Sequence, residues 1–572
     1  MNDTEVIVRY LYLGSDQPFY IQKNRPLDIK EGCRILAPIQ TLAAAITSAD
    51  DPDTKKLADS VTLTEHPVDM VARVMKSGAL VRNDECLFTL AFLARTFNKP
   101  EEKHKVYEMV PQLIGSSKDL FQFVYFYQEL SPKPGGGFGN GMRTALTKWY
   151  DKHSAEQLAM LFAMDRGWFN WCHKDILAMV HMNLEDVAKM QVVDAALGGI
   201  GRKHPPKSKK NNNSEKAESD TKPEIQQEDS KALKIYRRIK KFKTVQVASE
   251  ACTQISSHQY SIHVVPSQLH RSPAVWEALF PHMAYRDIVQ AALVLQDYKL
   301  LKDNDTQLSE AYGNVLNRVT AVSESKIHPI YVYQIMRLFE ERQRYLNVVK
   351  EAVHTANNLA LKNAIANPTV LRQFYNVLNY SMLNYQRTGL NFLVTLDLRS
   401  KQTKKRVFGN RLMSTQAAFV LLALPMFKRE THMQVLTFTE APQELANVDF
   451  TREMSFFQGC DYIQSIAKKK TKVDITQPIQ YARQTKKKVD VFITIVDSLI
   501  RVNPQRHSPV VALNNYNTET KRGARYIIVS LSRNKQDLYH KDMTATKGVL
   551  ELVGCTEDTP KLIDAYVKSK FT

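Results

Sequence analysis

Apolar residues recur at intervals of three and four along most of the first two thirds of the chain, a spacing that predicts amphipathic helices. In the run 83–97 they fall on one face, and Asn83 or Asp84 is placed to cap its start. Similar runs, separated by short breaks with Pro, Gly or Ser, cover residues 103–113, 117–130, 142–150, 156–164, 173–190, 273–280, 286–298 and 329–347. Many helices with brief connectors predict an α-solenoid between about 36 and 385, whose repeats are structural because no strict sequence repeat is visible.

The period changes beyond about residue 389. Short apolar runs have the composition of buried strands, and helical segments such as 414–426 lie between them; the strand runs are 391–397, 433–438, 489–496 and 525–531. This alternation predicts a parallel sheet covered on both faces. The sequence therefore predicts an all-α repeat domain over 1–388 and a doubly wound α/β domain over 389–572.

Two stretches interrupt the helical pattern. Residues 131–141 are rich in glycine and are expected to form a surface loop. Residues 198–232 are of low complexity and nearly free of apolar side chains, so we expect a disordered basic insertion. A strongly basic helix, 231–243, follows it.

Charge is the unusual bulk property. The chain of 572 residues has 78 Lys and Arg against 59 Asp and Glu, a formal net charge of +19. Such a surplus favours a polyanionic partner, either nucleic acid or an anionic membrane surface, although a protein that is merely basic is the simpler alternative. No window of about 18 apolar residues is present and the N-terminus lacks a signal sequence, so we expect no membrane partner.

Cysteine usage indicates an intracellular protein. Six cysteines are scattered without any paired spacing: Cys33, Cys86, Cys172, Cys252, Cys460 and Cys555. This pattern predicts reduced thiols and neither a disulfide framework nor a zinc site.

Residues 164–181 contain the most specific pattern in the chain. Arg166, Gly167 and a Trp-containing turn precede Cys-His-Lys-Asp at 172–175, and a helix then ends at His181. This block resembles the signature of the TROVE module, the helical-repeat RNA-binding ring of the Ro (SS-A/Ro) ribonucleoprotein autoantigen family, with Cys172 in place of a Ser. Residues 139–150 are similar to the family's Gly-Arg-x-x-Arg helix that ends in Trp-Tyr, except that Asn140 replaces the first Arg.

Weaker similarities follow in the same order. Residues 12–23 resemble the family's N-terminal strand pair, 275–279 and 327–329 match further downstream, and the α/β domain stands where Ro proteins carry a von Willebrand factor A-like domain. The resemblance thus covers nearly the whole chain, apart from the insertion.

The resemblance implies a closed ring of HEAT-like helix pairs, clasped by the A-type domain. Small noncoding hairpin RNA (Y-like RNA) would bind the outer surface, and single-stranded 3′ ends of misfolded noncoding RNA would enter the basic hole. It further implies a role in noncoding-RNA stability and quality control, with other RNA-processing proteins as partners, in the cytoplasm and also in the nucleus.

The residues themselves suit RNA. In a helix over 142–150, Trp149 is expected in the core, while Arg143 and Lys148 face outward. Both suit phosphate groups, because phosphate binding requires positive charge and donors but no precise geometry. Arg166 can fork onto phosphate or stack on a base. Of Trp168 and Trp171 one is expected in the core, and for the other a core position and base stacking are equally open.

His173 and Lys174 begin a helix whose N-terminal amides favour anions, so we predict both as RNA contacts. His181, two turns later, is expected to be a packing histidine. The basic run 234–243, together with His270 and Arg271, is a candidate for the same surface, although a solvated face is an equally good interpretation for each residue.

The α/β domain is expected to have lost the metal site of its class. An A-type domain normally carries Asp-x-Ser-x-Ser after its first strand, and these oxygens ligate Mg²⁺. Here the pattern is Asp397, Arg399 and Lys401, Cys460 replaces a later Thr ligand, and Asp497 holds the later acidic position. Two cations would repel a divalent ion and could pair with Asp397 and Asp497, so the sequence predicts a degenerate site and no cofactor.

An enzymatic function has little support, because the chain lacks GxSxG, Walker, HExxH and paired Cys–His patterns. The stronger rival to RNA binding is a helical-repeat scaffold that binds proteins without a specific RNA ligand.

Overall fold

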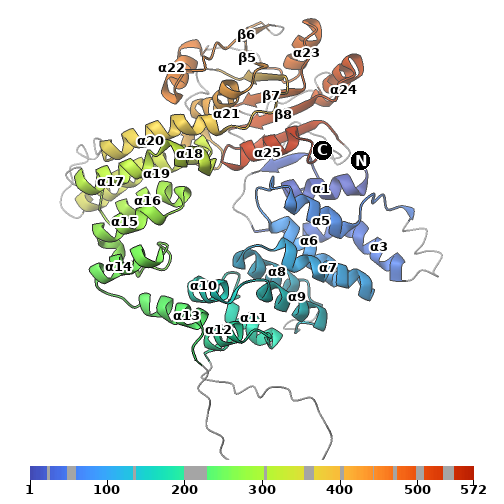
Figure 1. Cartoon of the computed structure of the whole chain (residues 1–572). Coiled ribbons are helices and arrows are strands. Elements are labelled where there is room, and N and C mark those ends of the chain that lie inside the picture. Colours follow the sequence, from blue (N-terminus) through green and yellow to red (C-terminus); the bar gives the residue numbers. More distant parts are fainter. Residues whose placement is uncertain are drawn as a thin grey trace, which may run out of the picture. The chain divides into compact units, whose positions relative to one another are not determined.

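The computed structural model describes residues 1–21, 26–47, 59–132, 137–198, 228–301, 306–352, 366–399, 405–441, 444–467, 473–497, 508–531 and 546–572. The described residues form two compact units. The small unit contains residues 87–246 with 263–266, and the large unit contains residues 1–86, 247–262 and 267–572. Each is described by itself (Figure 1).

The small unit is helical. Its helices are α6 (Asp84–Thr96, which begins in the large unit), α7 (Pro100–Leu113), α8 (Ser117–Glu129), α9 (Asn140–Asp151), α10 (Ala155–Met164), α11 (His173–Val180), α12 (Val187–Leu197) and α13 (Lys231–Phe242). They pack in pairs, with α7 on α9 and α10 on α13, as expected for helical repeats. Trp149 fills the core completely, and its indole N–H donates to the Ile114 carbonyl over 2.8 Å. The prediction that Trp149 is a core residue is confirmed.

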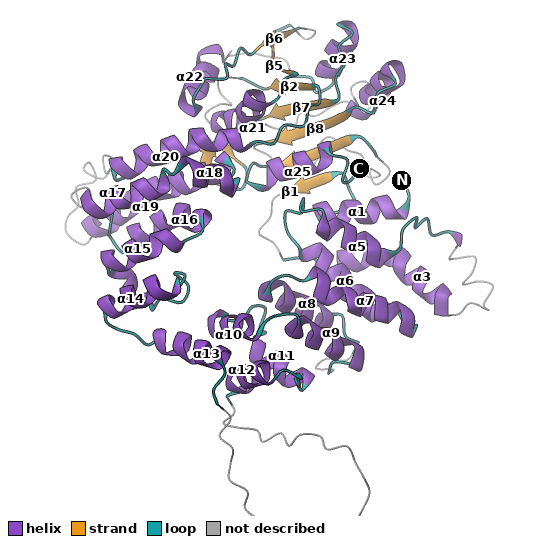
Figure 2. Cartoon of the chain, viewed as in Figure 1, coloured by secondary structure: helices purple, strands orange, loops and turns teal. Residues whose placement is uncertain are grey.

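The large unit combines helices with a sheet, as the colours of Figure 2 show. Its helices before the strand β2 (Phe392–Leu396) are α1 (Asp3–Leu13), α2 (Ile29–Ile35), α3 (Ala37–Thr47), α5 (Pro67–Lys76), α14 (Ala248–His258), α15 (Pro273–Leu279), α16 (Tyr285–Asp297), α17 (Thr306–Leu316), α18 (Val319–Ser325), α19 (Pro329–Ala352) and α20 (Pro368–Ser381). Helix α16 packs on α19, and α17 packs on α20, so helices that are not consecutive in the chain lie together.

The C-terminal part of the large unit is a doubly wound sheet. In the described residues the strand order is β1-β9-β8-β7-β2-β5-β6, and every pair is parallel except β5 with β6. The strands are β1 (Phe19–Ile21), β2 (Phe392–Leu396), β5 (Met433–Phe438), β6 (Leu445–Asn447), β7 (Val491–Val496), β8 (Arg525–Ser530) and β9 (Val549–Val553), and β3 (Arg406–Val407) with β4 (Asn410–Ser414) forms a separate hairpin. The helices between these strands are α21 (Thr415–Arg429), α22 (Phe456–Ile466), α23 (Gln477–Gln484) and α24 (Pro509–Thr520), and α25 (Asp558–Val567) follows the last strand.

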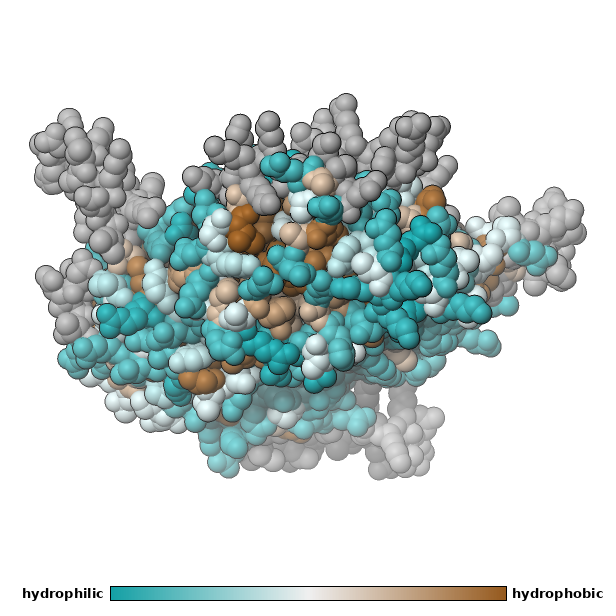
Figure 3. All heavy atoms as spheres, turned by 90° about the horizontal axis from the view of Figure 1, so that it is seen from above, coloured by the Kyte–Doolittle hydropathy of each residue, from teal (hydrophilic) through white to brown (hydrophobic). Residues whose placement is uncertain are grey.

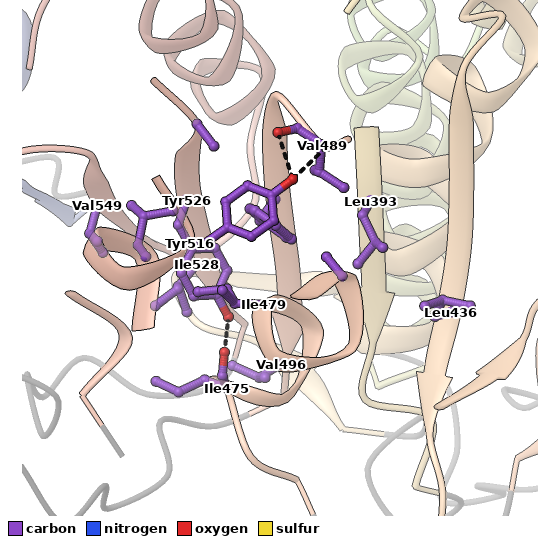
Figure 4. Close-up of a cluster of buried hydrophobic side chains, with 14 residues drawn as sticks. Leu393, Leu436, Ile475, Ile479, Val489, Val496, Tyr516, Tyr526, Ile528 and Val549 are labelled. Atoms are coloured by element: carbon purple, nitrogen blue, oxygen red, sulfur yellow. Dashed lines mark hydrogen bonds between the residues drawn. The ribbon is translucent and has the colours of Figure 1, made fainter. Parts of the chain in front are cut away.

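Aromatic hydroxyls fix the core on one face of this sheet (Figure 4). Ile479 of α23 and Tyr516 of α24 pack there with strand residues such as Tyr526. The Tyr516 hydroxyl donates to the Lys487 carbonyl and accepts from the Val489 N–H, each over 2.7 Å. Buried hydroxyls need such partners, so these bonds tie α24 to the segment that leads into β7.

The first strand of the chain is an edge strand of this sheet. Residues 19–21 pair in parallel with 551–553 of β9. Arg9 of α1, fully buried, donates to the main-chain oxygens of Asp16, Thr546 and Thr572, and Tyr12 stacks on Phe571 with ring centroids 4.9 Å apart. Segments from the two ends of the sequence therefore share one core, where α1 and α25 are drawn side by side (Figure 1).

The structure confirms a helical-repeat region followed by an α/β domain, and it corrects three local predictions. The run 173–190 is two helices, because His181 takes a left-handed conformation (φ 52°) that ends α11. The expected strand pair within 12–23 is only β1, since Tyr12 lies in α1. Strand β9 was not predicted. Of the insertion 198–232, residues 199–227 lie outside the described residues, and α13 already begins at Lys231.

A buried ion pair lies beside the end of α1. Glu85 is almost fully buried and pairs with Arg82. Gly14, the left-handed residue that ends α1, approaches so closely that a Cβ there would lie 2.6 Å from the Glu85 Oε1. Burial raises the pKa of Glu85 to about 7, although the Arg82 charge opposes the shift.

This pair generates a pH-dependent prediction. Between pH 4.5 and 7 the folded protein holds a proton on Glu85 that the unfolded chain has released, so Glu85 makes the fold less stable as the pH rises through this window. Glu85→Gln resembles the protonated acid at every pH. We expect the variant and the parent to melt together near pH 4.5 and the variant to become the more stable by about 3 kcal/mol at pH 8. A difference in melting temperature that is the same at both pH values would contradict this assignment.

Candidate nucleic-acid interface

The connection between α10 and α11 is a minimal β-hairpin in the small unit. Trp168 and Trp171 exchange both main-chain hydrogen bonds, over 2.8 and 2.9 Å. The two residues between them, Phe169 and Asn170, have φ of 55° and 63°. Positive φ at both central positions is the geometry of a type I′ turn, which suits the twist of a two-residue hairpin. A Cβ on Gly167 (φ 85°) would lie 2.6 Å from the Trp171 carbonyl, so the approach to the hairpin requires glycine.

The hairpin presents aromatic rings to solvent. Trp168 is 54% exposed, and the ammonium of Lys118 lies 5.1 Å from its ring centroid. Phe169 is 37% exposed and stacks on Tyr125 with centroids 5.7 Å apart. Trp171 is half-buried and tilts against Phe138. Neither Trp of the loop is a fully buried core residue, which corrects the expectation that one would be.

His173 holds this loop from inside. It is 5% exposed, its Nδ1 lies 2.9 Å from the Tyr150 hydroxyl, and its Nε2 lies 3.0 Å from the Asp165 carboxylate. Burial alone would raise the Asp165 pKa, but the hydrogen bond from His173 and the nearby charge of Lys243 bring it below its ordinary value. Both ring nitrogens are occupied, so His173 fixes the residue before Arg166 and does not itself face a ligand. The predicted direct contact of His173 with RNA is corrected to a positioning role.

Cations gather around the loop. Arg166 and Lys174 are exposed at its two ends, and Lys243, which follows α13, donates to the Ala163 carbonyl over 2.5 Å. Burial, and then the charges of Lys240 and Arg166, lower the pKa of the Lys243 ammonium. Lys240 and Arg166 therefore each lie close enough to Lys243 for their charges to act on its ammonium. We call these three residues the cation cluster.

Helix α13 extends this charge. Its apolar face packs inward, and its exposed side carries Lys231, Lys234, Arg237, Arg238, Lys240 and Lys241. The first three of these cations are paired with Glu156, Glu228 and Asp229. In the part of the chain that the structure describes, no carboxylate pairs with Lys240 or Lys241. An anion could bind at this end of α13 without displacing a bound carboxylate.

Not all predicted contacts come together. Lys148 is exposed on α9, whereas Arg143 is half-buried and its Nε has no hydrogen-bond partner among the described residues. His270 and Arg271 belong to the large unit, where the His270 ring packs against Trp276 and Tyr298 and Arg271 is exposed. His181 is exposed, so its predicted packing role is wrong.

In the α/β domain, two acidic residues follow adjacent parallel strands. Asp397 follows β2 and Asp497 follows β7, and both side chains are fully buried. Carboxyl ends of parallel strands are where such sheets bind ligands. Both Asp397 oxygens accept hydrogen bonds from the Arg399 guanidinium, and Lys405 donates to Asp497 over 3.1 Å.

These residues do not fit a divalent metal. Burial raises the pKa of Asp397 while Arg399 opposes the shift, and burial raises the pKa of the Cys460 thiol to about 12. Mg²⁺ needs oxygen ligands, whereas the two carboxylates here are already paired with cations, and Cys460 offers a protonated thiol in place of the expected Thr hydroxyl. The predicted pairing of Arg399 with Asp397 is confirmed, but the cation on Asp497 is Lys405, and Lys401 lies outside the described residues.

Comparison with known proteins agrees with this geometry. The sequence matches the TROVE domain family over residues 110–376 and the Ro60 vWA domain family over residues 391–567. The chain belongs to the Ro family of TROVE-domain proteins. Its relatives include two proteins named RNA-binding protein RO60. One, from Caenorhabditis elegans, is 23% identical over all of this chain and 88% of its own length, and one, from Deinococcus radiodurans, is 20% identical over 87% and 84%.

The fold of this Ro-family chain is also shared with a solved structure. The crystal structure of the Deinococcus radiodurans RO (RSR) protein has a TM-score of 0.75, with 18% sequence identity and complete coverage of both chains. None of the helices that the structure describes is long and apolar enough to cross a membrane. Among the same described residues, no group of three or more His, Cys, Asp or Glu side chains could hold a metal ion.

Sequence reasoning missed several residues of this Ro-family surface. Lys118 and Tyr125 come from α8, about 40–50 residues before the hairpin, and Phe169 has a bulky side chain at a turn position that normally favours Gly, Asn or Asp. The pair Trp168 and Trp171, separated by two residues of which one is Asn170, is the one local signal that could have suggested a hairpin.

The positioning role of His173 can be tested against its neighbour. His173→Leu would leave the Tyr150 hydroxyl and the Asp165 carboxylate without their partner, so we expect a loss of about 2–4 kcal/mol in unfolding free energy. Lys174→Leu, at an exposed neighbouring position, should change stability by less than about 0.5 kcal/mol. Thermal unfolding of the two variants beside the parent measures both. Equal stabilities for His173→Leu and Lys174→Leu would show that the buried hydrogen bonds do not hold this region.

Proposed function

We propose that this Ro-family chain is an RNA-binding protein that holds RNA through the small unit and performs no catalytic step. The observation that carries the proposal is the meeting of exposed aromatic rings with the cation cluster. Phosphates need charge and donors, and unpaired bases need flat apolar faces, and this surface offers both within one short loop and the helix beside it. The names of the two relatives support the same conclusion.

The more specific proposal concerns which RNA is bound. We propose a small noncoding hairpin RNA of the Y type on the helical repeats, and single-stranded 3′ ends of misfolded noncoding RNA in the central hole that the family resemblance implies. The role would be in noncoding-RNA stability and quality control, together with other RNA-processing proteins. We further propose that the protein acts in the cytoplasm and also in the nucleus.

A protein-binding scaffold is the second candidate function, and one surface of the large unit favours it. Tyr380, Leu383 and Phe457 are exposed, and Phe457 packs edge-on against Tyr375 with centroids 4.8 Å apart. Apolar side chains also gather near the centre of the otherwise hydrophilic face drawn in Figure 3. Exposed apolar patches commonly mark protein contacts. RNA binding through cations should weaken strongly as the salt concentration rises, whereas protein binding through an apolar surface should not.

Charge reversal tests the RNA proposal. We expect the double variant Lys174→Glu and Lys240→Glu to bind RNA at least about tenfold more weakly, because each exposed cation contributes to phosphate binding. The matched control, Lys561→Glu with Lys570→Glu, changes the net charge equally on exposed positions of the large unit. Filter binding of a labelled small hairpin RNA with a single-stranded 3′ tail gives the affinities.

The salt dependence is the second readout of this experiment. If six to ten phosphates are neutralised, the affinity of the parent should fall by roughly 10³–10⁵ between about 50 and 200 mM salt. An equal loss in both double variants would indicate a general charge effect and not this surface. A nearly flat salt response would contradict RNA binding by the cations.

For the α/β domain we propose a structural role as a clasp without metal, in which Arg399 and Lys405 supply the positive charge that a divalent ion would otherwise bring. This proposal is supported by the pairing of both cations with Asp397 and Asp497. Since no metal is required, its stability should not depend on divalent ions.

Magnesium titration tests the loss of the metal site. The melting temperature of the parent should be the same in 10 mM Mg²⁺ and in KCl of equal ionic strength, about 30 mM. Only Mg²⁺ bound at a specific site would raise it further, and the proposal is that the parent has no such site. The triple variant Arg399→Ser, Lys401→Ser and Cys460→Thr restores oxygen ligands and is expected to gain several degrees from Mg²⁺ but not from KCl. Specific stabilisation of the parent by Mg²⁺, abolished in Asp397→Asn, would overturn the proposal.

A further inference from the structure

The hairpin tip retains a conformation that its side chains disfavour. Phe169 and Asn170 both lie in the left-handed region, which Asn tolerates but which strains a bulky aromatic residue. The ring of Phe169 is not buried in return, since it is 37% exposed and makes its aromatic contact with the half-buried Tyr125. Packing therefore offers little compensation for the strain. Backbone strain that packing does not explain is typical of functional sites.

The strain sets the directions of two exposed rings. The turn fixes the main chain at Phe169, and the paired main-chain bonds fix Trp168, so the hairpin holds both aromatic residues in place. Lys118 lies over one face of the Trp168 ring, and the 54% exposure of that residue leaves much of the ring accessible. A rigid, exposed ring loses little conformational entropy when a flat ligand stacks on it.

Charge around the tip indicates the class of ligand. Lys118 touches the ring, and Arg166 of the cation cluster stands two residues before Trp168. Unpaired nucleotides combine a flat base with a phosphate and so match a ring flanked by cations. Base-paired RNA hides its base faces in the stack, and a purely apolar peptide would leave these cations without anions.

We propose that Trp168 and Phe169 form a stacking site for unpaired bases of single-stranded RNA, with Lys118 and Arg166 holding the adjoining phosphates. The site rests on the proposed RNA-binding function and makes it specific: the tip would distinguish single strands from duplexes by stacking and not by sequence, because every base has a stacking face.

The experiment uses the full chain and a fluorescein-labelled ten-nucleotide oligouridine, with a ten-unit abasic ribose-phosphate strand of the same charge as the probe without bases. Trp168→Ala should weaken oligouridine binding about tenfold and leave binding of the abasic strand unchanged. Trp168→Phe, which keeps a ring, should lose no more than about threefold. Phe169→Gly fits the left-handed turn better than Phe, so it should bind oligouridine several-fold more weakly while melting at the same or a higher temperature.

Tryptophan fluorescence gives an independent readout. Trp149 and Trp276 are buried and Trp171 is half-buried, so stacking should mainly quench the emission of the exposed Trp168 indole. Most of this quench should be lost in Trp168→Phe, although that variant still binds. If Trp168→Ala binds oligouridine as tightly as the parent, the stacking site is wrong while RNA binding through the cations stands. If the parent binds neither the oligouridine nor a tailed hairpin RNA, the proposed function itself fails. Equal weakening of both strands by Trp168→Ala would assign the loss to charge or folding and would also overturn the stacking site.

Discussion

The pairing of β1 with β9 is the constraint on which the large unit depends. Three residues near the start of the sequence complete a sheet whose other strands lie beyond residue 390, and the buried Arg9 ties α1 to main-chain oxygens at 546 and 572. A buried guanidinium is stable only if its donors are used, so these bonds must form together. Because α1 packs on α5, the first helices are fixed to the C-terminal sheet. The A-type domain cannot acquire its edge strand until the N-terminal segment arrives, which makes the fold of this unit non-local.

The small unit separates support from recognition. Buried hydrogen bonds support the 165–172 loop. His173 bonds with the Tyr150 hydroxyl and the Asp165 carboxylate, and the Trp149 indole donates to the Ile114 carbonyl. The exposed groups of the unit, such as Trp168 and Lys174, lie on the surface for which we propose RNA contacts. The same division holds in the α/β domain, where Arg399 satisfies the buried charge of Asp397. A cation that is part of the chain cannot leave, whereas a metal ion can, so these ion pairs are part of the structural framework of the domain.

Local periodicity was sufficient to predict most helices and the main buried strands, because their patterns are set within one or two turns. The strand β1 could not be predicted as part of the sheet, since three residues carry little signal and their partner lies some 530 positions away. His173 looked exposed as the first residue of a helix, and only the tertiary positions of Tyr150 and Asp165 bury it. The hairpin at Trp168 was missed because Phe rarely takes a positive φ. The pairing of Arg399 with Asp397 could be predicted because Arg399 replaces a Ser of the metal-binding pattern, which places a positive charge two residues after the acid.

The central claim is that the basic, aromatic surface of the small unit exists to hold RNA. Crosslinking in living cells, followed by purification of the protein and sequencing of the attached RNA, tests this most directly. The account predicts strong enrichment of small noncoding RNA, with crosslink sites in unpaired nucleotides and in peptides that contain residues 164–181 or α13. Recovery of proteins without any enriched small RNA would contradict it and would favour the protein-binding scaffold.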